Sequence, residues 1–190
     1  MVRVARRLAL VIVFFLSAAC SEPPNKEMNL AQGAIEAARA AGADRFAAAE
    51  FTAAIDALKH SNEAAADDDY RLALNHALDS FERAQNAAKW AVEGRANARG
   101  EAERVVAQVA TLLATAETQL KASSLPARTL KAPQQTIDAS GMALQKARSA
   151  LAKEDYLAVG PALDGIAGGL QAALTEIDAP SPAAPARRKR

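Results

Sequence analysis

The side chains that could serve catalysis or metal binding are few and lie far apart in this sequence. His60 and His76 are the two histidines, and Asp67-Asp68-Asp69 is a run of three carboxylates. Acid–base catalysis needs titratable groups held at one place in different environments. The two histidines fall on different predicted helices, and we expect each to be an ordinary helix-surface side chain rather than a ligand or base.

The aspartate run has the oxygen ligands that a hard cation such as calcium prefers. It lacks the glycine and the long bidentate ligand of a calcium loop, and a helical pattern begins directly after it. Aspartate at a helix start accepts hydrogen bonds from free amide groups and interacts favourably with the helix dipole. We therefore expect this run to cap the following helix rather than to bind calcium. No serine–histidine–acid set, glycine-rich phosphate loop or zinc pattern is present. We therefore predict a protein that is not an enzyme, with no catalytic residue, cofactor or metal.

Three aromatic residues, Tyr70, Trp90 and Tyr156, could form a surface on which sugars stack. Their helical spacing favours a different interpretation, packing in the core or at helix corners.

Cys20 is the residue with an assignable chemical role. It is the only cysteine and follows a positive start at Arg3, Arg6 and Arg7 and an apolar run from Leu8 to Leu16. This order is typical of a secretory signal, and the apolar run is too short to span a bilayer. We expect residues 1–19 to be a signal peptide.

The sequence Leu16-Ser17-Ala18-Ala19-Cys20 resembles the lipobox of bacterial lipoproteins, with Ser17 where that family usually has leucine. The resemblance implies cleavage before Cys20 and a diacylglycerol on its thiol. The residue after the cysteine is Ser21. In the lipoproteins that the chain resembles, an aspartate at this position implies retention in the inner membrane, so serine implies the outer membrane, with the protein facing the periplasm. An ordinary secretory signal with an incidental cysteine is the alternative.

The two ends of the mature chain differ in composition from its body. We expect residues 20–27 to be a lipidated tether and residues 179–190 to be an Ala/Pro-rich basic tail. The net charge of the whole chain is +1, so removing the three leader arginines and the four basic residues of the tail leaves −6 for the segment between them. An acidic body argues against a nucleic-acid partner.

The body, residues 28–178, is predicted to be helical. Hydrophobic residues make up 51% of the chain but aromatic residues only 4%, and roughly a quarter of the chain is alanine, the strongest helix former. Apolar residues recur at helical spacing in five places. The fourth run is expected to start a helix at Ala132-Pro133, and the fifth is expected to form a helix that carries the apolar residues from Val159 to Ile177. A loop is expected around Asp44-Arg45-Phe46.

The helical runs repeat within the chain. Placing Tyr70 over Tyr156 aligns Asp69 with Asp155 and Phe51 with Ile137, which indicates an internal duplication with copies at about 28–92 and 105–178. Between them Gly94 to Glu101 is polar on every side, as in a helix that bridges two packed regions. We predict one helix from about Asp69 to Ser123, with a kink at Gly100 as the alternative. The predicted fold is all-α, an elongated helical bundle from two duplicated three-helix units sharing one long central helix.

The turn Asp69-Tyr70 and the alanines after it are similar to the turn into the second helix of tetratricopeptide repeats. With Ala34 to Arg39 and the alanine-rich hairpin, the chain resembles small alanine-rich bacterial periplasmic lipoproteins of unknown function, a resemblance that implies fold and address but no activity. We expect a non-enzymatic helical scaffold or adaptor, attached to the membrane through lipidated Cys20, for a periplasmic protein partner. The alternative is a binding or accessory subunit that holds a cell-wall fragment or lipid between helices. The sequence leaves the oligomeric state open.

Overall fold

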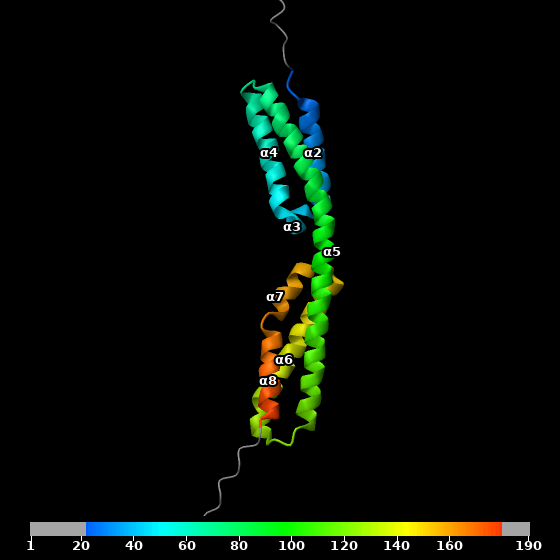
Figure 1. Ribbon diagram of the computed structural model, residues 1–190, viewed down its shortest axis with the longest axis vertical. Helices are drawn as coiled ribbons and strands as arrows, with labels where there is room; N and C mark the ends of the chain where they lie inside the picture. Colours follow the sequence, from blue (N-terminus) through cyan, green and yellow to red (C-terminus); the bar gives the residue numbers. More distant parts are fainter. Residues whose placement is uncertain (1–21, 180–190) are drawn as a thin grey trace, which may run out of the picture. The chain divides into compact units, whose positions relative to one another are not determined.

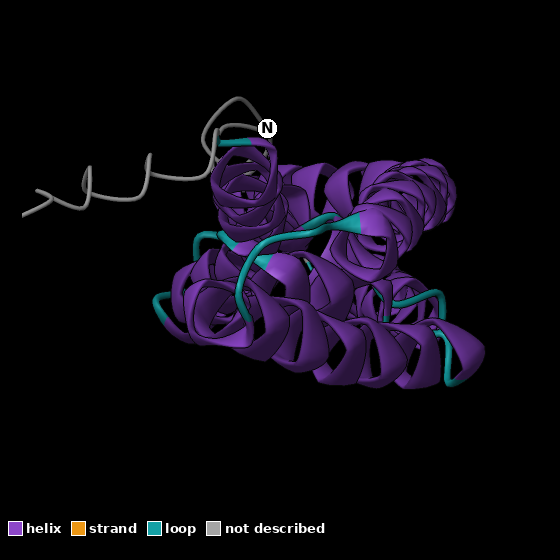
Figure 2. Cartoon of the chain, turned by 90° about the horizontal axis from the view of Figure 1, so that it is seen from below, coloured by secondary structure: helices purple, strands orange, loops and turns teal. Residues whose placement is uncertain are grey.

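The computed structural model describes residues 22–179, and all its regular structure is helical (Figures 1 and 2). The leader, Cys20 and the basic tail lie outside the described residues. No strand occurs within the described range, so the all-α prediction is confirmed. The elements are α2 (Asn25–Ala40), α3 (Ala43–Phe46), α4 (Ala48–Ala66), α5 (Tyr70–Ala122), α6 (Ala127–Ala152), the 3-10 turn η1 (Tyr156–Ala158), α7 (Val159–Leu163) and α8 (Ile166–Asp178).

Helix α5 takes part in two compact units, which divide between Gly94 and Arg95. The first unit contains α2, α3, α4 and the N-terminal part of α5, and the second contains the remainder of α5 with α6, η1, α7 and α8. The helix continues through Gly100 without a break. The prediction of one long shared helix is therefore confirmed.

The core of the first unit is built mainly from alanine. Three helices supply its buried apolar side chains: Ala31, Ile35 and Ala38 from α2, Phe51, Ala54 and Leu58 from α4, and Ala84, Ala87 and Ala91 from α5. Small side chains allow the helix backbones to approach closely. Two buried hydroxyls join α4 and α5, because Ser61 Oγ donates to the carbonyl of Ala73 and Ser80 Oγ donates to that of Ala54, each at 2.7 Å.

The second unit has a core of larger side chains. Helix α6 packs against both α7 and α8. The buried apolar residues include Val109 and Leu113 from α5, Ile137 and Leu144 from α6, and Val159, Leu163, Leu170 and Ile177 from the last two helices.

The corner between α4 and α5 in the first unit and the corner after α6 in the second unit have the same backbone conformation. Asp68 has φ 59° and Glu154, 86 residues later, has φ 58°. At the first corner the amide of Asp69 donates to the carbonyl of Ala64, and at the second the amide of Asp155 donates to that of Ala150, both at 2.9 Å. These are the 6→1 bonds of a Schellman helix ending. The two corners therefore match in backbone conformation as well as in sequence.

Three predictions about individual helices and loops are wrong. Helix α6 starts at Ala127, after the extended Pro126, and Pro133 lies buried inside it. The predicted loop around Asp44-Arg45-Phe46 is instead the short helix α3, which follows Gly42 in the left-handed conformation at φ 84°.

The third correction concerns the final apolar run. It is broken between α7 and α8, because Asp164 is extended and Gly165 adopts φ 70°. A left-handed glycine ends a helix at little steric cost. Apolar periodicity continues across this break, so the sequence pattern alone does not reveal it.

By length and composition alone, the segment Tyr156–Asp178 is apolar enough to cross a membrane, with a mean hydropathy of 1.3. Its large side chains Leu163, Leu170 and Ile177 are buried within the second unit. The segment is interrupted at Gly165, and 22% of its most apolar stretch is buried.

Candidate functional site

The two histidines lie on different helices, as predicted, but the fold brings them together. The ring centroids of His60 on α4 and His76 on α5 are 5.5 Å apart, with the rings tilted by 59°. Within residues 22–179, no group of three or more His, Cys, Asp or Glu side chains is placed to hold a metal ion. The pair is a contact between α4 and α5.

The aspartate run forms bonds within its own corner. The Asp69 carboxylate accepts a hydrogen bond from the amide of Leu72 at 3.0 Å, which makes Asp69 the N-cap of α5. The Asp68 carboxylate accepts a hydrogen bond from the Tyr70 hydroxyl at 2.7 Å. Both carboxylates therefore have a local structural role.

The aromatic residues divide into two classes. Tyr156 is buried in the second unit, which agrees with the expected core packing. Trp90 on α5 of the first unit is 46% exposed, so core packing is the wrong prediction for this residue.

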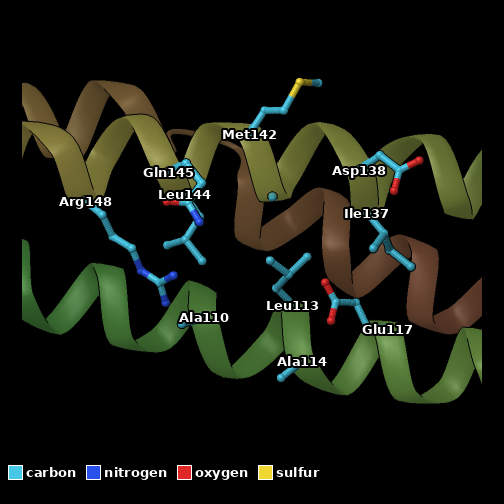
Figure 3. Close-up of a pocket in the computed structure, with 11 residues that line it drawn as sticks. Ala110, Leu113, Ala114, Glu117, Ile137, Asp138, Met142, Leu144, Gln145 and Arg148 are labelled. Atoms are coloured by element: carbon cyan, nitrogen blue, oxygen red, sulfur yellow. The ribbon is translucent and has the colours of Figure 1, made fainter.

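A groove lies between α5 and α6 in the second unit (Figure 3). Its volume is about 740 Å³. The floor contains Leu113 of α5 and Ile137 and Leu144 of α6, whose side chains are largely buried. Met142 also belongs to the lining and is 70% exposed, and in Figure 3 its side chain points away from α5.

Close approach of the two helices forms the groove's middle. A Cβ built on Gly141 of α6 would meet Leu113 Cδ2 of α5 at 4.0 Å, an ordinary contact distance. Ala110 and Ala114 add only methyl groups from α5. A wall of small residues leaves room above the apolar floor.

The charged residues of the groove are separated along its length. Arg148 lies toward one end, whereas Glu117 of α5 and Asp138 of α6 lie toward the other (Figure 3). All three are solvent exposed. The groove therefore has an apolar floor, one basic end and one acidic end.

The chemistry of this lining favours binding. The described lining contains no serine, cysteine or histidine, and its charged side chains are Glu117, Asp138 and Arg148. An apolar floor with a few charges at its ends is typical of a site that orients a ligand.

Sequence reasoning missed this groove because its residues come from two helices joined by a turn. Periodicity assigned Met142 to an apolar stripe with Ile137 and Leu144, which predicts burial of all three. Only Ile137 and Leu144 are buried. No residue of the lining carried a signal in the sequence, since Gly141 lies only in ordinary contact with the Leu113 side chain.

Cys20, the predicted lipidation site, lies outside the described residues. The part of the chain that is described defines a class: an all-α protein of two three-helix units that share one helix, with an open groove on the second. Comparisons with protein-family models, curated protein sequences and solved structures find no match to this chain.

Proposed function

We propose that this protein is a membrane-anchored envelope lipoprotein that acts as a non-enzymatic helical scaffold, with the α5–α6 groove as the site for a protein partner. The observation that carries the proposal is the groove's combination of an apolar floor, an exposed methionine and charges of opposite sign at its two ends. Methionine is common at binding surfaces because its flexible side chain adapts to different partners.

An amphipathic helix is the partner segment that fits this lining. From Ala110 to Glu117 the α5 wall extends over about 10 Å, or two helical turns. An apolar helix face packs into such a groove through residues spaced by three and four. A basic partner residue next to Glu117 and Asp138 and an acidic one next to Arg148 would set its direction.

Three features of the sequence support a location in the cell envelope: the leader, the resemblance around Cys20 to a lipobox, and the resemblance of the chain to alanine-rich periplasmic lipoproteins. Lipid attachment at Cys20 would place the helical body at the periplasmic face of the outer membrane. A Cys20→Ser variant should then be released as a soluble periplasmic protein. A variant that still requires detergent for extraction would contradict this part of the proposal.

The second candidate function is the binding of a cell-wall fragment or a lipid between helices. The observation that favours it is the groove volume of about 740 Å³, which is within the range of small-ligand sites. The two functions differ in the molecule that occupies the groove, so one crosslinking experiment tests both.

A photoreactive amino acid at position 142 should capture the groove's occupant in intact cells. The matched control is the same group at position 157, because Leu157 is 46% exposed in the same unit but does not line the groove. We expect a discrete protein adduct from position 142 alone, and we expect Arg148→Glu to weaken it. Glycan or lipid adducts would establish the second function, and equal labelling at both positions would overturn the groove as the site.

A further inference from the structure

The first unit has an exposed apolar face that its own fold does not cover. Helices α2 and α5 form a shallow groove of about 380 Å³, whose lining contains no charged residue. Leu30 of α2 beside it is 51% exposed. Along the same stripe of α5, Leu78 and Val92 are 50% and 64% exposed. We name this surface the α2–α5 face.

The internal duplication allows the exposed residues of this face to be compared with the residues at the same positions of the second unit. Leu78 corresponds to Asp164 in the second unit, and Val92 corresponds to Asp178, when Tyr70 is placed over Tyr156. Both aspartates are exposed. In the second unit these positions fall just after α7 and at the last residue of α8, whereas in the first unit both lie inside α5. Large apolar side chains that are exposed along one side of a helix mark a candidate interaction surface.

Two exposed apolar residues of this face, Leu78 and Val92, are arranged symmetrically about Gln85, and a charged pair lies nearly so. Leu78 lies seven residues before Gln85 and Val92 lies seven after, and seven residues are two helical turns. The exposed residues Glu82 and Lys89 lie three before and four after. In an antiparallel pair of α5 helices that cross at Gln85, each copy would place Leu78 against Val92 of the other and Glu82 against Lys89 of the other.

We propose that the occupant of the α2–α5 face is a second copy of this chain, in a twofold dimer whose α5 helices cross at Gln85. A twofold interface must be self-complementary, because each contact between two different residues occurs twice. The face meets this condition in both its apolar pair and its charged pair. The small floor residues Gly33, Ala34 and Ala37 allow close approach, and a Cβ at Gly33 would meet no atom within 4 Å.

The first test introduces the residues that the second unit already carries. In sedimentation experiments on the detergent-solubilised chain, Leu78→Asp and Val92→Asp should each raise the dimer dissociation constant by about a hundredfold, because both copies bury the new carboxylate. Circular dichroism should show unchanged helix content. The control is Leu157→Asp, which replaces a leucine of similar exposure outside the face and should leave the dimer intact.

The second test locates the twofold axis. In a Cys20→Ser background, Gln85→Cys should form a disulfide-linked dimer under mild oxidation, because position 85 meets itself at the axis. The matched control is Gln171→Cys, since Gln171 occupies the corresponding position of the second unit. A chain that remains monomeric at all concentrations, or equal crosslinking from both positions, would overturn the proposal. So would a monomer whose binding to phospholipid vesicles is lost in Leu78→Asp, because lipid would then be the occupant.

Discussion

Gly94 of α5 lies directly against the backbone of Phe46 in α3. A Cβ built on Gly94 would be 2.6 Å from the Phe46 carbonyl oxygen, a distance that real Cβ atoms essentially never show. Because the atom it would meet belongs to the backbone, a side-chain rotation cannot relieve the overlap. The glycine thus allows α3 to pack at the end of the first unit.

The first prediction compares this glycine with a second one six residues further along α5. Gly94→Ala should lower the free energy of unfolding by about 1–3 kcal/mol, the usual cost of overpacking. Gly100→Ala should raise it by up to about 1 kcal/mol, because alanine is the better helix former and a Cβ there would meet no atom within 4 Å. Urea unfolding of both variants measures the difference. Equal effects would show that α3 does not pack as described.

The second prediction concerns the strained corner at Glu154, whose φ of 58° favours glycine. Glu154→Gly should be about 1 kcal/mol more stable than Glu154→Ala, because a Cβ is disfavoured in the left-handed region. Both variants lose the ion pair between Glu154 and Arg95, so the difference between their stabilities reports only the cost of the left-handed backbone conformation. Thermal unfolding at one pH is the measurement, and equal stabilities would argue against a left-handed residue at this corner.

The third prediction addresses the close contact between α4 and α5. Ser80 is fully buried and donates its hydroxyl to the Ala54 carbonyl at 2.7 Å. Ser80→Leu should destabilise the protein by about 1–3 kcal/mol, because the added volume separates the two helices. Thr118→Leu is the control, since Thr118 also donates to a helix carbonyl but is exposed, and its effect should stay within about 0.5 kcal/mol.

The fourth prediction is electrostatic. The Arg104 guanidinium donates two hydrogen bonds to the Glu101 carboxylate, at 2.6 and 2.9 Å, and these bonds together with its charge lower the pKa of Glu101. A lowered carboxyl pKa stabilises the folded helix at neutral pH, and this contribution is lost as the pH falls through the range where Glu101 is protonated. Carbon-detected NMR titration should show the Glu101 pKa rising toward its ordinary value in Arg104→Gln. Arg99→Gln, which removes the arginine paired with Glu103, should leave it unchanged.

Sequence alone determined the helical class, the shared helix and the duplication. These are local properties: alanine favours helix at every position, and Asp69 and Asp155 follow helix endings whose hydrogen bonds span only six residues. Periodicity therefore predicts α5 from residue 69 to 123, close to its bounds of Tyr70–Ala122.

Tertiary structure decided which apolar residues are covered. Met142 and Leu144 belong to the same apolar run of α6, but only Leu144 is buried, because neighbouring helices cover one side of α6 and leave the other open. The contact of His60 with His76 and the packing of Gly94 against Phe46 likewise join residues on different helices. A helical period specifies a face, whereas burial depends on contacts between residues that are distant in the chain.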